Sequence, residues 1–111
     1  MILKKYEIVE EDSFIKFKFY YNEDDLTFNI ISYLVELCNK NDYYYSKYDG
    51  VFNIKVYGKY DKDYNRINPK IDYDLIEELY KNPTKCFMYN DDENPVLDLF
   101  SKVMVKCFES T

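Results

Sequence analysis

Apolar residues recur every three or four positions between Asn22 and Lys40, and this spacing predicts one long helix. Asn22 is a suitable N-cap, and the acidic run from Glu23 to Asp25 matches the positive end of a helix dipole. Only a narrow stripe of the helix is polar, so most of its surface must be covered by other elements. The rest of the chain is therefore expected to pack around this helix.

Alternation of apolar and polar residues predicts strands on both sides of the helix. Phe14 to Tyr21 has the clearest alternation, and Ile2 to Glu10 is expected to pair with it as a hairpin. After the helix, Asp49-Gly50 separates two more strands, Tyr43 to Tyr48 and Val51 to Gly58. Glycine supplies the positive φ that such a two-residue turn requires, so this is a second hairpin.

The last part of the chain predicts a loop, a helix and a strand in succession. The loop is Lys59 to Lys70, and the helix runs from Asp72 to Lys81. The helix stops at Asn82-Pro83, because a residue that precedes proline avoids helical geometry. Thr84 to Tyr89 is then a short strand.

Asn94-Pro95 has the pattern of an N-cap followed by proline in the first helical position. The residues after it, as far as Phe108, fit one apolar helical face, so we expect a C-terminal helix. A strand over Val103 to Phe108 is the alternative.

These elements predict an α+β fold in the order β-βαββαβ-α, with an antiparallel sheet and helices on one face. The segment from Phe14 to Tyr89 has the order of a ferredoxin-like core, to which an N-terminal strand and a C-terminal helix are added. The length predicts a single domain over residues 1–111. The first strand, Ile2 to Glu10, lies at an edge and could pair with a second copy in a homodimer.

Composition fits a globular protein, with 47% hydrophobic residues and a net charge of −6. The three cysteines are odd in number and lie in apolar surroundings, which favours reduced, buried thiols and a cytoplasmic location. No apolar segment is long enough to span a bilayer, so no membrane partner is expected.

The chain lacks the residues of the common catalytic sites. Without histidine it has no Ser-His or Cys-His pair, and two glycines could not build a phosphate-binding loop. We therefore expect no enzyme activity, no catalytic residues and no cofactor.

One calcium-loop pattern is present but incomplete. Asp61, Asp63, Asn65 and Asp72 occupy its first, third, fifth and twelfth positions. Arg66 stands where the pattern requires glycine, and the preceding segment is a predicted strand rather than a helix. A solvated loop is favoured over a metal site.

Acidic residues form the first candidate site. In the predicted topology three acidic groups share one end of the molecule, which would suit a basic partner surface. These residues are Glu10, Glu11, Asp12, Asp61, Asp63, Asp91, Asp92 and Glu93. The main functional hypothesis is a small acidic protein that binds and inhibits a basic protein, for example a nuclease or a nucleic-acid-binding protein. By size and charge this class includes phage anti-CRISPR proteins, which act in the host cytoplasm, and immunity proteins of nuclease toxins.

Lysine interleaved with aromatic residues forms the second candidate site. If Ile15, Phe17 and Phe19 face the helix, then the residues between them face away from it. Lysine can pair with phosphates and aromatic rings can stack on bases, so such a sheet face predicts a single-stranded nucleic-acid platform. The residues of this alternative site are Lys16, Lys18, Tyr20, Lys55 and Tyr57.

Overall fold

The computed structural model describes residues 3–22, 27–88 and 94–109. The chain forms two compact units, Met1–Asn68 and Pro69–Thr111. The first unit contains a four-stranded sheet, a two-stranded sheet and a helix, and the second is helical. An organisation as one domain over the whole chain stays a prediction.

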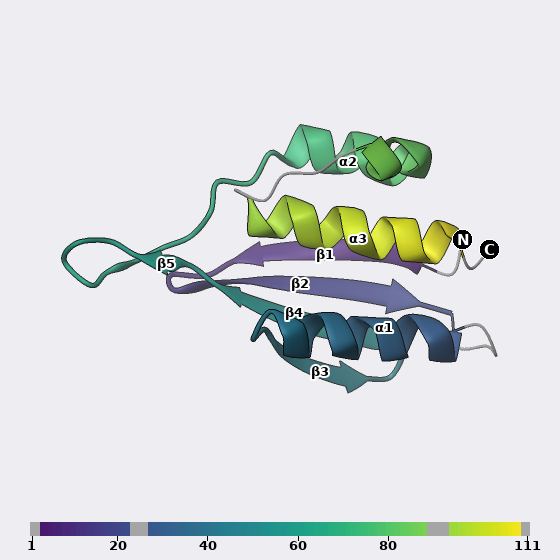
Figure 1. The fold of residues 1–111 in the computed structure, drawn as a ribbon, viewed down its shortest axis with the longest axis horizontal. Coiled ribbons are helices and arrows are strands. Elements are labelled where there is room, and N and C mark those ends of the chain that lie inside the picture. Colours follow the sequence, from purple (N-terminus) through teal and green to yellow (C-terminus); the bar gives the residue numbers. More distant parts are fainter. Residues whose placement is uncertain (1–2, 23–26, 89–93, 110–111) are drawn as a thin grey trace. The chain divides into compact units, whose positions relative to one another are not determined.

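The first unit is built on a four-stranded antiparallel sheet (Figure 1). Its strands lie in the order β1-β2-β4-β3, so β1 and β3 are the edges. The bounds are β1 Leu3–Glu10, β2 Phe14–Tyr21, β3 Tyr44–Tyr48 and β4 Val51–Tyr57. The predicted α+β class, the antiparallel sheet and both hairpins are confirmed, and β1 is at an edge as expected.

One face of the sheet supplies the core of this unit. Register pairs Phe17 with Ile54 and Phe19 with Phe52 across β2 and β4. Phe17 and Phe19 of β2 are almost completely buried, and their stacked ring centres lie 4.6 Å apart. Because side chains alternate along a strand, this packing fixes the residues between them on the opposite face.

The helix α1, Thr27–Lys40, lies along the sheet (Figure 1). Its apolar stripe is buried at Ile30, Leu34, Leu37 and Cys38, which confirms the face predicted from the spacing. The predicted first turn, residues 23–25, lies outside the described residues.

The β3–β4 turn has the geometry that the Asp49-Gly50 pair predicts. Asp49 has a φ of 47° and Gly50 a φ of 75°, so both central residues are left-handed. This backbone matches the twist of the flanking strands and brings β3 back along β4.

The predicted loop from Lys59 to Lys70 contains a short hairpin, which corrects the sequence interpretation. Its strands are β5, Lys59–Tyr60, and β6, Arg66–Ile67. At its base a side chain on Gly58 would lie 2.3 Å from the carbonyl oxygen of Ile67, so glycine permits the close approach. The side-chain amide of Asn68 donates to the backbone carbonyls of Glu11 and Phe14, which ties this base to the β1–β2 turn.

The second unit consists of α2, Tyr73–Lys81, a 3₁₀ helix η1, Pro83–Met88, and α3, Pro95–Glu109. Asp72 caps α2 by accepting a hydrogen bond from the Leu75 amide at 3.0 Å. Asn94 caps α3 in the same way through the Leu97 amide at 3.2 Å. The C-terminal helix is therefore confirmed, and the alternative strand over Val103 to Phe108 is wrong.

The predicted strand over Thr84 to Tyr89 is also wrong as far as Met88, and Tyr89 lies outside the described residues. Pro83 begins a helical turn there, and the Lys85 amide donates to the Asn82 carbonyl at 3.0 Å. The apolar run is short enough to fit a strand or a helical turn equally well, and Cys86 is its buried residue. In the sheet, β2 is paired on both sides, with β1 and β4. The ferredoxin-like order is therefore not confirmed.

Candidate functional site

The second face of the sheet, opposite α1, carries the lysines and tyrosines of the alternative site. We call it the open face. Register places Phe14 opposite Tyr57 and Lys16 opposite Lys55 on adjacent strands. The side chains along this face are half-buried or exposed, in contrast to the buried residues between them. The central residues of the open face are Lys16, Lys18, Tyr20, Asn53, Lys55 and Tyr57. All five residues predicted for this site thus lie on one face.

Lys16 and Lys55 lie directly opposite each other in the middle of the open face. Like charges in this position destabilise a sheet. Over the described ranges, Lys16, Lys18 and Lys55 have no ion pair with a carboxylate. The Lys55 ammonium lies 5.0 Å from the centre of the Phe14 ring, which is a cation–π contact. The arrangement therefore leaves uncompensated positive charge beside an aromatic ring.

On the β1 side of the open face, Glu7 is engaged by two neighbours. The Tyr20 hydroxyl donates to a Glu7 carboxylate oxygen at 3.1 Å, and the Lys5 ammonium lies 3.7 Å from the same oxygen. Lys5 also lies 4.4 Å from the centre of the Tyr20 ring. Desolvation, followed by the hydrogen bond and the charge of Glu7, raises the pKa of Tyr20. The tyrosine hydroxyl is thus held in place as a neutral donor.

At the other end of the face, Tyr57 is surrounded by aromatic and cationic groups. Its ring centre is 5.5 Å from that of Phe14 and 5.4 Å from that of Tyr44. The Arg66 guanidinium lies 4.8 Å from the Tyr57 ring centre and 4.3 Å from that of Tyr60. The Tyr57 ring is therefore held in place by contacts with Phe14, Tyr44 and Arg66.

Sequence reasoning missed Arg66, Tyr60 and Tyr44 as members of this cluster. Arg66 also donates to the Gly58 carbonyl at 3.0 Å, which fixes the guanidinium at the base of the β5–β6 hairpin. The one sequence signal for this cluster was Gly58 at the end of a predicted strand, because an isolated glycine there often marks a close approach of two backbone segments.

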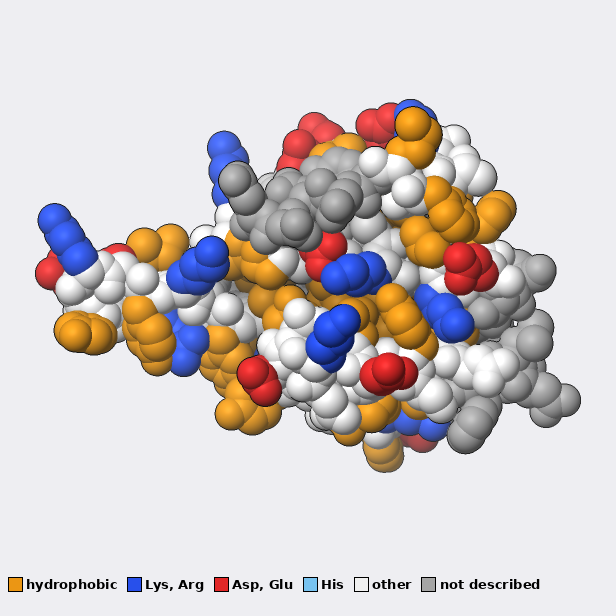
Figure 2. All heavy atoms as spheres, in the orientation of Figure 1, with side chains coloured by type: hydrophobic (Ala, Val, Ile, Leu, Met, Phe, Trp, Pro, Cys, Tyr) orange, Lys and Arg blue, Asp and Glu red, His pale blue; other side chains and the backbone are white. Residues whose placement is uncertain are grey.

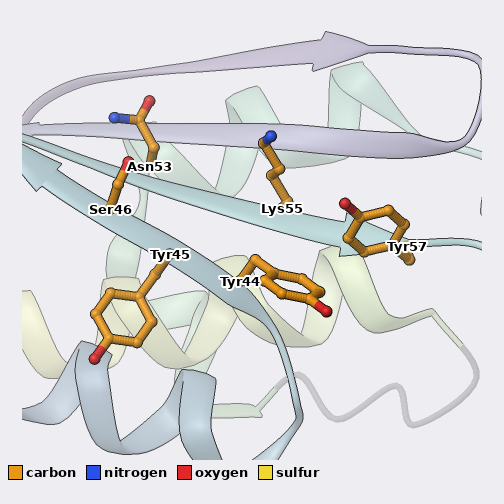
Figure 3. A pocket seen from close by; sticks show the side chains of 6 residues that line it. All are labelled: Tyr44, Tyr45, Ser46, Asn53, Lys55 and Tyr57. Atoms are coloured by element: carbon orange, nitrogen blue, oxygen red, sulfur yellow. The ribbon is translucent and has the colours of Figure 1, made fainter.

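A shallow pocket of about 190 Å³ opens between β3 and β4 (Figure 3). Ser46 and Asn53 lie opposite each other at one part of it, and Tyr44 and Lys55 at the next. Tyr45 also contributes to the lining, but its ring stacks on Phe52 of the core face at 5.5 Å.

The acidic candidate residues are only partly brought together. Glu10, Glu11 and Asp12 lie at the β1–β2 turn, beside the base of the β5–β6 hairpin that carries Asp61 and Asp63 in its loop. One oxygen of Asp61 accepts the amides of Asp63 and Asn65 at 2.8 and 2.9 Å, so this carboxylate shapes the loop. Residues 91–93 lie outside the described residues, and the strand expected to lead to them is absent.

The hairpin itself extends away from the end of the sheet (Figure 1). Figure 2 shows hydrophobic and basic side chains along it, and Tyr60, Tyr64 and Ile67 are among its exposed residues. The acids of the hairpin loop are thus mixed with aromatic and basic groups rather than forming a uniform acidic surface.

The described part of the chain contains no group of three or more His, Cys, Asp or Glu residues that could hold a metal ion. The three cysteines all lie in the described ranges, and they are buried and not disulfide-bonded, as predicted. Burial raises the pKa of Cys38 and that of Cys107 to about 11, and it also raises the pKa of Cys86. None of the described helices is both long and apolar enough to cross a bilayer.

Comparison of the chain with models of known protein families, with curated proteins and with solved structures found no match.

Proposed function

We propose that this protein is a non-enzymatic binding module whose open face takes single-stranded nucleic acid. The observation that carries the proposal is the register of β2 on β4, which aligns Lys16 with Lys55 and Phe14 with Tyr57. The lysines in the middle of this surface are then flanked by aromatic rings at both ends. A single strand requires this combination, because cations pair with its phosphates and rings stack on its unpaired bases.

Local charge favours this function despite the net charge of −6. Lys5, Lys16, Lys18 and Lys55 lie on the open face with one carboxylate, Glu7, which gives a local charge of +3. Charges separated by more than about 10 Å are largely screened at 0.1 M salt. A single nucleic-acid strand in contact with the open face is therefore influenced mainly by the positive charge of these lysines.

The test is a titration of a labelled 12-nucleotide single strand, followed by fluorescence anisotropy at several salt concentrations. If Lys5, Lys16, Lys18 and Lys55 all contact phosphates, the logarithm of the binding constant should fall with the logarithm of salt with a slope of about −2.8, at about −0.7 per contact. Replacing Lys16, Lys18 and Lys55 by Gln should reduce that slope to about −0.7. Lys47→Gln is the matched control, because Lys47 is exposed on the core side of β3 opposite Phe52. Absence of binding at low salt would refute the proposal.

A second candidate function is inhibition of a basic protein through the acidic turn. The observation in its favour is the Asn68 side chain, which holds the turn of Glu10, Glu11 and Asp12 beside the base of the β5–β6 hairpin. This places the turn and the hairpin loop with Asp61 at one end of the first unit. Complementary charge at such a surface mainly sets the rate and specificity of association.

Charge reversal tests this second candidate. Glu10, Glu11 and Asp12 are replaced together by Lys, and the variant is compared with Glu36→Lys, which alters an exposed acid on α1. A cationic partner isolated with the wild-type protein should associate more slowly with the turn variant and at the wild-type rate with the control. Equal association rates for both variants would contradict a role for the acidic turn.

A further inference from the structure

The pocket between β3 and β4 contains more kinds of side chain than a surface that binds single-stranded nucleic acid of any sequence needs. Register places Ser46 opposite Asn53 and Tyr44 opposite Lys55 on the open face. The pocket thus combines a hydroxyl, an amide, an aromatic ring and a cation within two residue pairs (Figure 3). We call these four residues the tyrosine pocket.

The polar side chains of the pocket are available to a ligand. Across the described residues, neither Ser46 nor Asn53 makes a side-chain hydrogen bond. An asparagine amide offers one acceptor and two donors, and a serine hydroxyl offers both functions. The pair can therefore read the edge of a planar ligand that has its own donors and acceptors.

The ring of Tyr44 supplies a stacking surface beside these polar groups. Its side chain is 67% exposed, whereas the Tyr57 ring that it meets edge-on is fixed by Phe14 and Arg66. An exposed ring braced at its edge can accept a base on its face at little conformational cost. Stacking on one aromatic residue contributes about 1–3 kcal/mol per base.

The volume indicates how much of a ligand fits. Sites for complete small ligands occupy about 300–1,000 Å³, whereas this pocket measures about 190 Å³. It suits a single base rather than a whole nucleotide. Lys55 lines the pocket and Lys16 lies opposite it on β2, so both ammonium groups are placed to receive the phosphate at the mouth of the pocket.

From these observations, and resting on the proposed single-strand function, we propose that the tyrosine pocket binds one adenine base of the strand. Adenine matches an asparagine amide, which can donate to one of its ring nitrogens and accept from its amino group. In this arrangement Asn53 and Ser46 read the base edge, Tyr44 stacks on the base, and the lysines hold the phosphate.

The test compares two strands that differ at one base: a thymine 12-mer, and the same strand with adenine at one central position. The adenine strand should bind at least about fivefold more tightly, the lower limit for a good paired contact to a base edge. Asn53→Ala should remove this preference while leaving the salt slope unchanged. Asn29→Ala, on the exposed side of α1, is the matched control and should keep the preference. Adenosine monophosphate, titrated alone, distinguishes a free nucleotide from a base within a strand.

Each outcome separates this inference from the function on which it rests. Equal binding of the two strands would overturn the adenine pocket but leave the single-strand function standing. Binding of adenosine monophosphate without binding of either strand would support the pocket and refute the single-strand function. A preference that survives Asn53→Ala would overturn the assignment of the pocket, and a loss of binding to every probe would refute both proposals.

Discussion

Replacing Lys16 by Gln should stabilise the fold and weaken binding at the same time. Lys16 lies directly opposite Lys55, and neither lysine has an ion pair with a described carboxylate. Directly opposed side chains on adjacent strands have Cβ atoms about 5 Å apart. Two unit charges at about that distance in water repel each other by roughly 0.8 kcal/mol.

The flexible stems of the two lysines reduce this repulsion, since the Lys55 ammonium leans over the Phe14 ring at 5.0 Å. We therefore expect Lys16→Gln to raise the free energy of unfolding by about 0.5 kcal/mol, within the range for cross-strand pairs. That corresponds to an increase of about 2–4 °C in Tm. Binding of a single strand should lose one phosphate contact, which reduces the salt slope by about 0.7.

Thermal unfolding followed by circular dichroism measures the first effect, and anisotropy titrations at several salt concentrations measure the second. Lys47→Gln makes the same change in charge at a position that pairs with Phe52 on the core side of the sheet. It should change neither quantity. The reasoning is refuted if Lys16→Gln lowers Tm, or if it binds strands with the wild-type salt slope.

Four further predictions concern the framework of the molecule. Gly58→Ala places a methyl group 2.3 Å from the Ile67 carbonyl oxygen, so the β5–β6 hairpin should open and its amide protons should exchange with deuterium much faster than in the wild type. Asp72→Ala removes the cap of α2 and should cost about 1 kcal/mol in the free energy of unfolding by urea denaturation; an unchanged midpoint would contradict the cap. Burial raises the pKa of Cys38 and of Cys107 to about 11, so a thiol reagent at pH 8 should label them slowly until the protein is denatured. Since folding favours the protonated thiols, their contribution to stability is present below pH 9 and should be lost as the pH rises through 11, which urea denaturation at a series of pH values measures.

The open face was predictable because the alternation in β2 is unambiguous. Once Phe17 and Phe19 are assigned to the core, the strand period fixes Lys16 and Lys18 on the other side. The Asp49-Gly50 turn then sets the register of β3 on β4. Local sequence patterns were sufficient to assign side chains to the open face, because one face of each strand had to be buried.

The parts that sequence reasoning missed depend on contacts between distant residues. Arg66 joins Tyr57 only because the chain returns past Gly58, and apart from this glycine nothing in the local pattern of that polar segment indicates a hairpin. The segment after Pro83 is a short apolar run whose neighbours, not its own periodicity, determine a helical turn. The predicted acidic end relied on that segment as a strand, so its third acidic group lost its structural basis.

The most direct test of the central claim is an amide chemical-shift map of the ¹⁵N-labelled protein titrated with the adenine-containing 12-mer at low salt. A strand on the open face should shift the amides around Lys16, Lys18, Asn53 and Lys55 and leave those along α1 near their free positions. Shifts that cluster on α1, or at the turn of Glu10 to Asp12, while β2 and β4 remain unchanged would contradict binding at the open face.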